Sequence, residues 1–234
     1  MKQAPYILFI SDLHLDPRHI ELTKKFLFFM QNHQNAEAIY ILGDFFNAFI
    51  GEDDDSSYVE QIKSACREYT QKGGQLYIMA GNRDFLMQTH FAKSIGAIHL
   101  ADPSIKTIYG LKCFLMHGDS LCTDDTAHQK WRSIYTRSWL YKLAHLVPLK
   151  VRQWIAHKMR KASIKRKSTQ PAYIMDVNAK AVLKAITSTN CDYLIHGHTH
   201  LPKDHGRRLV LGAWPDPQSI IQLNQDQTFK RLDP

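Results

Sequence analysis

The chain has 234 residues, of which 44% are hydrophobic and 22% charged, a composition typical of a folded globular protein and unlike that of disordered, collagen-like or disulfide-rich chains. Its apolar runs are far shorter than the roughly 20 residues that span a bilayer, and the first is too short for a secretory signal, so we expect neither a transmembrane helix nor export. The net charge of +8 favours an anionic partner, and four cysteines without a CxxC pair favour a reducing, cytoplasmic location.

Short runs rich in β-branched and aromatic residues predict the strands of the fold. In chain order these runs are Tyr6–Ile10, Ala38–Leu42, Gln75–Met79, Lys112–Met116 and Asp192–Ile195. Two stretches with helical periodicity, Glu21–Gln34 and Ser57–Gln71, separate the first three runs. This alternation of strand and helix predicts an α/β fold.

A cluster of polar residues follows each predicted strand. The clusters are Asp12-Leu13-His14, Gly43-Asp44, Gly81-Asn82-Arg83-Asp84, His117-Gly118-Asp119 and His196-Gly197-His198-Thr199-His200. Because loops at the carboxyl ends of strands converge in an open α/β sheet, we expect these clusters to meet at one site.

The clusters supply seven oxygen or nitrogen donors that suit metal ions. These donors are Asp12, His14, Asp44, Asn82, His117, His196 and His198. One ion that must also hold water and substrate does not need seven protein ligands, whereas two ions that share a carboxylate do. Imidazole mixed with carboxylate and amide oxygen favours Mn, Fe, Co or Zn over Ca or Mg. Two such ions about 3.5–4 Å apart are a known arrangement for hydrolysing phosphate esters and anhydrides.

In this order, the five clusters resemble the motifs of the calcineurin-like metallophosphoesterases. Further stretches resemble one branch of that superfamily, the UDP-2,3-diacylglucosamine pyrophosphohydrolases of lipid A biosynthesis. These stretches are Tyr40–Phe46, Gly51–Asp54, Leu121–Asp125, Ile174–Asn178 and Leu211–Trp214. The resemblance implies a single domain over residues 1–234, built as a two-sheet α/β sandwich flanked by helices.

The resemblance also implies two Mn²⁺ ions, with other divalent transition metals as substitutes. One ion would take Asp12, His14, Asp44 and His198, and the other Asp44, Asn82, His117 and His196, so that Asp44 bridges them. These two ligand sets are complete without His200. Asp84 and Asp119 are expected to orient ligands rather than to contact metal.

The implied activity is hydrolysis of UDP-2,3-diacylglucosamine to UMP and 2,3-diacylglucosamine 1-phosphate (lipid X), through attack of a metal-activated hydroxide on the α-phosphorus. Asp44, Asn82, Arg83 and His117 form the predicted catalytic set. Most members of the superfamily carry a histidine, a candidate acid for a leaving alkoxide, where this chain has Arg83. A leaving phosphate, whose second pKa is about 6, needs no such acid, and arginine offers phosphate oxygens a planar fork of donors. Arg83 therefore favours a phosphoanhydride substrate.

One segment carries the whole excess of positive charge. Residues 126–175 contain twelve basic residues and no acidic one, which leaves 18 basic and 22 acidic residues elsewhere. Aromatic and aliphatic residues alternate with these charges at helical spacing, so we predict a helical insertion that covers the metal site as a lid and contacts an anionic membrane surface. By the resemblance, the predicted substrate contacts are Asn82, Arg83, Asp125, Ser163, Lys167, Gln170 and His196.

Other interpretations stay open at this point. The insertion could be a helical hairpin whose lysines face water. The same dinuclear core would serve a cyclic-nucleotide phosphodiesterase or a nuclease, although Arg83 and the amphipathic insertion argue against nucleic acid as a partner. A catalytically inactive adaptor at a membrane surface would keep the fold, but it would not need the complete ligand set. We expect a monomeric enzyme, associated peripherally with the cytoplasmic side of the inner membrane.

Overall fold

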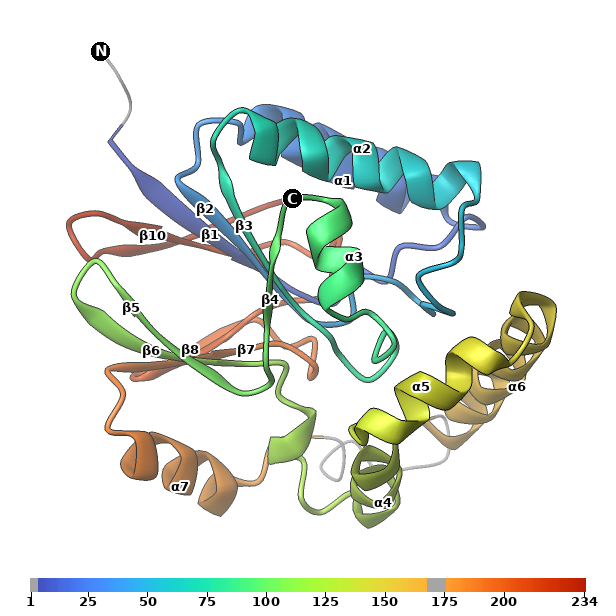
Figure 1. The fold of residues 1–234 in the computed structure, drawn as a ribbon. Helices are drawn as coiled ribbons and strands as arrows, with labels where there is room; N and C mark the ends of the chain where they lie inside the picture. The colour runs from blue at the N-terminus through green and yellow to red at the C-terminus, as the bar shows by residue number, and fades with distance from the viewer. Residues whose placement is uncertain (1–3, 168–175) are drawn as a thin grey trace.

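The computed structural model describes residues 4–167 and 176–234, and its core consists of two β-sheets packed face to face (Figure 1). The first sheet has the strand order β11-β10-β1-β2-β3-β4. Its strands are β1 (Tyr6–Ile10), β2 (Ala38–Leu42), β3 (Gln75–Met79), β4 (Ile98–Leu100), β10 (Ile220–Asn224) and β11 (Phe229–Leu232). Strands β1 to β4 are parallel, and β10 and β11 extend the sheet by antiparallel pairing.

The second sheet has the strand order β5-β6-β7-β9-β8. Its strands are β5 (Ser104–Ile108), β6 (Leu111–Met116), β7 (Tyr193–His196), β8 (Lys203–His205) and β9 (Arg208–Val210). Strands β6, β7 and β9 are parallel, with an antiparallel strand at each edge. The five predicted strands are confirmed: β1, β2 and β3 have the predicted bounds, β6 begins one residue earlier than predicted, and β7 begins and ends one residue later.

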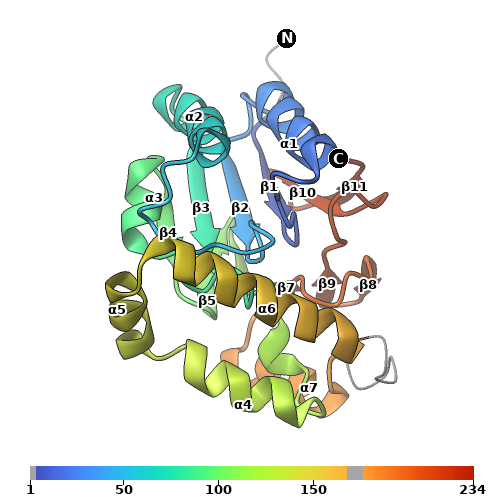
Figure 2. The ribbon, with the colours of Figure 1, turned by 90° about the vertical axis from the view of Figure 1, so that its right-hand side faces the viewer.

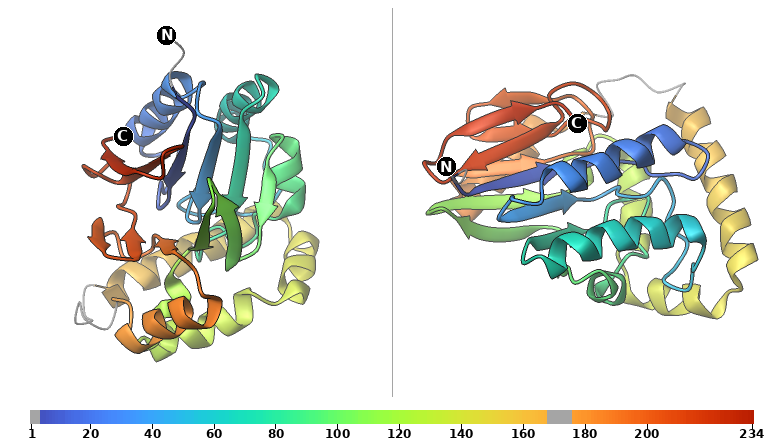
Figure 3. Two further views of the ribbon diagram at one scale, coloured as in Figure 1. Left: turned by 90° about the vertical axis from the view of Figure 1, so that its left-hand side faces the viewer. Right: turned by 90° about the horizontal axis from the view of Figure 1, so that it is seen from above.

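Helices cover the outer face of each sheet (Figures 1 and 3). The helices α1 (Ile20–Asn32), α2 (Ser57–Gln71) and α3 (Thr89–Ser94) pack on the first sheet, and α7 (Ala179–Thr189) packs on the second. Helix α2 begins after Ser56, whose hydroxyl oxygen accepts a hydrogen bond from the backbone N–H of Val59. The α/β sandwich flanked by helices is thus the fold of this chain.

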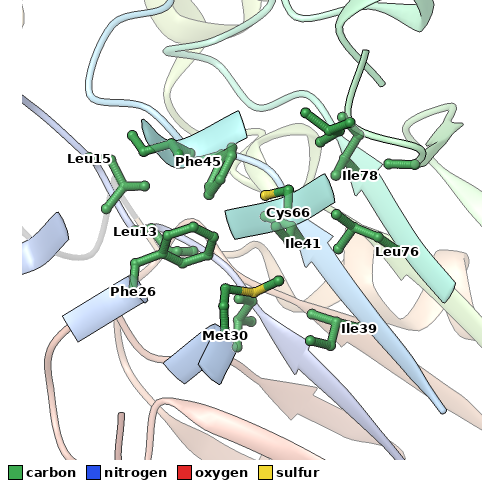
Figure 4. Packing of buried hydrophobic residues seen from close by; sticks show 14 of the residues in the cluster. Leu13, Leu15, Phe26, Met30, Ile39, Ile41, Phe45, Cys66, Leu76 and Ile78 are labelled. Atoms are coloured by element: carbon green, nitrogen blue, oxygen red, sulfur yellow. The ribbon is translucent and has the colours of Figure 1, made fainter. Parts of the chain in front are cut away.

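Strands β1 and β2 are buried on both faces, which explains their unbroken apolar runs. Ile39 and Ile41 of β2 point to the helices and share a core cluster with Phe26 and Met30 of α1 (Figure 4). The residue between them, Tyr40, points the other way and belongs to the cluster that fills the space between the sheets. This double burial holds the ends of the central strands in fixed positions.

A helical insertion follows β6. After the short 3-10 helix η1 (Asp119–Leu121) come α4 (Thr126–Tyr135), α5 (Ser138–Leu146) and α6 (Leu149–Lys167). Figures 2 and 3 show α6 running across the ends of the strands, on the side where the predicted site lies. Within the two described ranges, no helix combines the length and the apolar character that a membrane span requires.

Arg152 of α6 anchors the insertion to the core. Its guanidinium donates to the carbonyl oxygen of Ile50 (2.5 Å) and to the carboxylate of Asp53 (2.7 Å), and its Nε donates to the carbonyl oxygen of Val147 (2.8 Å). Arg152 is only 6% exposed, so this member of the basic segment does not face water. The backbone at Gly51 passes so close that a Cβ atom there would lie 1.8 Å from Nη1 of Arg152.

Candidate metal centre

The loops after β1 and β2 run side by side and bring two predicted clusters together. The backbone N–H of Asp12 donates to the carbonyl oxygen of Gly43 (3.1 Å), and that of His14 donates to the carbonyl oxygen of Asp44 (3.0 Å). The loops after β3, β6 and β7 reach the same edge of the molecule. The predicted convergence of the clusters is therefore observed.

The backbone of this site adopts conformations that residues with side chains usually avoid. Five non-glycine residues of the site have φ between 50° and 69°, namely Asp12, His14, Asp44, His198 and His200. Such left-handed residues cost free energy and concentrate at functional sites, where the surrounding structure holds them in place. Here they direct their side chains into one small volume.

Two glycines allow the loops to approach this closely. A Cβ atom on Gly197 would lie 2.3 Å from Oδ2 of Asp12, and one on Gly43, whose φ is +89°, would lie 2.5 Å from Nδ1 of His117. Real Cβ atoms do not come so close to other atoms. Any side chain at either position would displace a predicted ligand.

The first group of candidate ligands consists of Asp12, His14 and His200, which offer atoms that all lie within 4.8 Å of one another. Nε2 of His200 lies 3.2 Å from Nε2 of His14 and 3.2 Å from Oδ1 of Asp12. Among the described residues, Oδ1 of Asp12 and Nδ1 of His14 are buried and have no hydrogen-bond partner. Converging donors with unmet bonding capacity are what a cation site requires.

The second group consists of Asp12, Asp44 and His117, again within 4.8 Å of one another. Nε2 of His117 lies 3.6 Å from Oδ1 of Asp44 and 3.0 Å from Oδ1 of Asn82. Nδ1 of His198 lies 3.2 Å from the same His117 nitrogen. The backbone N–H of His198 also donates to Oδ2 of Asp12 (2.8 Å), so His198 lies against residues of both groups.

His196, predicted as a ligand of the second ion, lies outside both groups. It is the last residue of β7, and its Nδ1 lies 2.9 Å from the carbonyl oxygen of Gly197. Burial lowers its pKa to about 4. Histidines stand at 196, 198 and 200, so spacing alone could not tell which two leave the strand. Nε2 of His196 is buried and has no hydrogen-bond partner among the described residues, so this nitrogen is left for a metal ion. His196 and His198 are therefore kept as candidate ligands, and His200 is a further donor beside Asp12 and His14.

The electrostatics of the site match a divalent cation. Burial lowers the pKa of His14 and of His198 well below the usual range, so both imidazoles are neutral. Burial also disfavours a proton on His117, but the carboxylates of Asp44 and Asp12 outweigh this effect and raise the pKa of His117 to about 9. Neutral imidazoles and ionised carboxylates are the forms that bind metal. The donor set therefore fits divalent metal ions.

Arg83 and Asp84 support the centre in different ways. The Asp84 carboxylate is buried and accepts hydrogen bonds from the backbone N–H groups of Phe45 and Gly81 (2.6 Å each), which ties two of the ligand loops together. The backbone N–H of Arg83 donates to Oδ1 of Asp44 (2.9 Å), and its Nε lies 3.1 Å from Oδ2. A permanent positive charge thus lies beside the candidate bridging carboxylate.

A cavity of about 670 Å³ opens from this centre and continues under the insertion. One end is lined by Asp44, Asn82, Arg83, His198 and His200, and the other by apolar side chains of α5 and α6, among them Leu140, Leu143, Val147, Ile155 and Met159. The walls of one cavity are therefore polar where the metal ligands lie and apolar where the insertion covers it.

Two predicted substrate contacts of the insertion, Asp125 and Ser163, line this cavity. The Asp125 carboxylate also caps α4 by accepting a hydrogen bond from the backbone N–H of His128 (2.9 Å). The two other predicted contacts of the insertion are Lys167 and Gln170. The side chain of Lys167 and the whole of Gln170 lie outside the described part of the chain.

Arg160 lines the cavity too, although the sequence analysis did not single it out. Burial and the neighbouring Arg83 guanidinium lower its pKa to about 10, so two guanidinium groups lie near each other in the cavity. Such a pair attracts a phosphate-rich ligand. Arg160 lies three residues before Ser163, a spacing that puts both side chains on the same face of the helix. This spacing is the signal in the sequence that could have identified Arg160 as a residue of the site.

Comparisons with known proteins agree with this geometry. Residues 5–202 match the family model described as calcineurin-like phosphoesterase. A Vibrio cholerae serotype O1 protein named UDP-2,3-diacylglucosamine hydrolase is 39% identical over 226 residues, which cover 92% of this chain and 93% of its own. Proteins with the same name from Marinobacter nauticus and Yersinia pseudotuberculosis serotype O:1b are 40% and 39% identical, covering 94% of this chain and 94% and 95% of their own.

Proposed function

The chain belongs to the calcineurin-like phosphoesterase family, and from this premise we propose that it hydrolyses the pyrophosphate bond of UDP-2,3-diacylglucosamine in lipid A biosynthesis, releasing UMP and 2,3-diacylglucosamine 1-phosphate. The relatives named UDP-2,3-diacylglucosamine hydrolase match over more than nine-tenths of this chain, the insertion included. A shared substrate is the simplest reason for so complete a match.

The observation that carries the proposal is the two-ended cavity. A diacylated UDP-sugar has a pyrophosphate that needs cations and acyl chains that need an apolar wall. Arg83 and the candidate metal ligands lie at one end of the cavity, and the apolar side chains of α5 and α6 form the other. A phosphodiester without acyl chains would leave the apolar end unfilled.

We place two Mn²⁺ ions, or equivalent divalent transition metals, in the centre. Asp12, His14, Asp44 and His198 would hold one ion, and Asp44, Asn82, His117 and His196 the other. Asp44 suits the bridging place because its two carboxylate oxygens face different groups: Oδ2 lies 3.8 Å from Nδ1 of His14, and Oδ1 lies 3.6 Å from Nε2 of His117. Bound ions of this kind lower the pKa of water and neutralise phosphate charge.

The side chains of the chain itself orient the pyrophosphate. The Arg83 side chain is almost buried at the cavity wall, where its guanidinium can donate to phosphoryl oxygens that gain charge during the reaction. Attack at the α-phosphorus makes the acylated sugar phosphate the leaving group. Since a leaving phosphate monoester has a second pKa of about 6, no protonated side chain has to assist its departure.

The outer surface of the insertion suits an anionic membrane. Leu146 and Trp154 are 80% and 57% exposed, and lysines of α6 lie beside them, including Lys158, whose Nζ lies 3.9 Å from the centre of the Trp154 ring. Apolar side chains among lysines, without acidic residues, bind the interface of an anionic bilayer. We propose that the insertion acts as a lid that takes the substrate from this surface, in a protein that works as a monomer because one chain supplies the whole site.

The test is turnover of Mn²⁺-loaded protein on UDP-2,3-diacylglucosamine and on the matching deacylated UDP-sugar, with UMP release as the readout in ¹⁸O-water. We expect Mn²⁺-dependent cleavage of the acylated compound alone, with the label in UMP. Equal cleavage of both compounds would remove the lipid specificity, and label in the sugar phosphate would move the attack to the other phosphorus. Faster cleavage of bis(p-nitrophenyl) phosphate or DNA would replace the proposal by a phosphodiesterase.

A further inference from the structure

Arg132 of α4 connects the insertion to two carboxylates behind the metal centre. Its Nη2 donates to Oδ2 of Asp102 (3.0 Å), and its Nε donates to Oδ1 of Asp119 (3.2 Å). Asp102 follows β4, and Asp119 opens η1, so a single guanidinium joins a helix of the insertion to loops of both sheets. The planar guanidinium group of arginine can donate to two carboxylates at once, whereas the ammonium group of a lysine would make this double contact less well.

The two carboxylates lead directly to a candidate metal ligand. Oδ1 of Asp102 accepts a hydrogen bond from the backbone N–H of His117 (3.1 Å). Asp119 lies two residues after His117 and also accepts a hydrogen bond from the hydroxyl of Tyr135, at the end of α4. The main chain that carries His117 is therefore held from behind by a network whose cation is Arg132.

This network does not line the substrate cavity. Asp102, Asp119, Arg132 and Tyr135 line a separate cavity of about 680 Å³. Arg132 has no place in the wall of the cavity that contains Asp44 and Arg83. Any effect of Arg132 on the reaction must therefore pass through the residues that it holds.

We propose that Arg132 is a positioning residue that fixes the metal ligand His117 and joins helix α4 to the metal centre. Removal of its side chain would break both ion pairs at once. Asp119 would keep the Tyr135 hydroxyl and His128 as partners, whereas Asp102 would lose its connection to the insertion. Asp102 would then shift, and the acceptor for the His117 backbone N–H would move with it. Displacement of the His117 imidazole weakens the metal site that it completes.

The inference depends on the proposed metal centre, so the experiment measures metal binding separately from turnover. Mn²⁺ affinity is measured by titration calorimetry for the parent protein, R132A and R132K. Co²⁺-substituted samples are compared by their visible absorption, which reports the coordination geometry of folded protein. R137A is the matched control, because Arg137 lies between α4 and α5, its guanidinium donates to the carbonyl oxygen of Ser133 in α4, and it contacts no candidate metal-site residue in the described ranges.

We expect R132A to bind Mn²⁺ at least about tenfold more weakly than the parent and to change the Co²⁺ spectrum, with kcat partly restored at high Mn²⁺. R132K, which keeps the charge but loses the planar fork, should show a smaller loss of the same kind. R137A should match the parent in all three measurements. Parent-like affinity and spectrum in R132A, or in R132K if R132A does not fold, would overturn this inference alone. A parent protein that binds no Mn²⁺ would overturn the proposed function and this inference together.

Discussion

The metal centre and the helical insertion are held in opposite ways. The centre consists of buried side chains on short loops, directed by left-handed backbone and by glycines that leave no free space. The insertion exposes large apolar residues and is tied to the core through a few long side chains, chiefly Arg132 and Arg152. Chemistry that needs fixed geometry would therefore lie in the core, and the lipid recognition that we propose would lie in the part with fewer attachments. Substitutions should separate the two.

The largest effect should come from Asp44→Asn in the core. This change keeps the size of the side chain and removes the charge of the proposed bridging carboxylate, whose Oδ2 lies 3.8 Å from Nδ1 of His14 and whose Oδ1 lies 3.6 Å from Nε2 of His117. Because changes outside the ligand shell already cost 10–100-fold, loss of a shared ligand should lower turnover by more than about a hundredfold. Circular dichroism should show an intact fold, and metal analysis should show reduced Mn²⁺ content. Parent-like turnover at saturating Mn²⁺ would contradict the two-metal assignment.

A matched pair of substitutions tests which histidines belong to the centre. His196→Asn should weaken Mn²⁺ binding by about tenfold or more, because its buried Nε2 has no hydrogen-bond partner among the described residues and is left for a metal ion. His200→Asn should weaken it less, since the two proposed ligand sets are complete without His200. Calorimetric titration of both variants checks this, and the reverse order of affinities would make His200 the ligand in place of His196.

Metal binding should depend on pH through His117. Without metal, the surrounding carboxylates hold a proton on this imidazole up to pH 9 or so, because its pKa is raised to about 9. Metal must displace that proton, so Mn²⁺ affinity should rise about tenfold per pH unit from pH 7 towards 9 and then level off. Calorimetry in two buffers of different ionisation enthalpy should detect one proton released at pH 7.5. Affinity that is flat over this range would contradict the assignment.

Arg152→Ala should affect lipid recognition more than chemistry. It removes the charged hydrogen bonds to Ile50 and Asp53, and the free energy of unfolding should fall by about 2 kcal/mol. With α6 less firmly attached, KM for the acylated substrate should rise several-fold, whereas kcat at saturating substrate should not change. Denaturant titration and steady-state kinetics check both expectations. A fall in kcat as large as the rise in KM would show that the insertion also orders the metal centre.

The smallest effect should come from the outer surface of the insertion. Trp154→Ala should weaken binding to vesicles that contain anionic phospholipid by about threefold and leave hydrolysis in detergent unchanged. Phe28→Ala on α1 is the control, because Phe28 is 63% exposed and belongs to a helix on the other side of the first sheet. Vesicle sedimentation should separate the two variants. Equal weakening would mean that exposure alone, rather than this surface, drives the binding.

Sequence predicted most reliably what burial on both faces imposes. The strands β1, β2 and β3 were predicted with their observed bounds because their apolar runs end where the polar clusters begin. The exposed three-residue strand β8 carries no such pattern and was not predicted. The histidines at the end of β7 show another limit. The spacing of two residues fits His196 with His198 and equally His198 with His200, so the spacing alone cannot choose between these pairs.

The basic segment shows why charge alone does not assign roles. In the sequence its cations look alike, yet Arg132 and Arg152 pair with core carboxylates, Arg160 lines the cavity, and Lys158 lies over an exposed tryptophan ring. Only tertiary contacts with residues up to a hundred positions away distinguish these cases. Helical periodicity could locate the segment in the sequence, but it could not assign a role to each of its basic residues.

The close passage of the backbone at Gly51 against Arg152 has an evolutionary consequence. A side chain at position 51 and an arginine at position 152 cannot occupy the same space, since a Cβ atom would lie 1.8 Å from Nη1. Related sequences should therefore carry glycine at 51 wherever arginine stands at 152. The φ of +141° at Gly51 disfavours other residues there for a separate reason, so lineages that lose the arginine should still favour glycine at 51. Position 152 would then be the one that traces which relatives kept this attachment of the insertion.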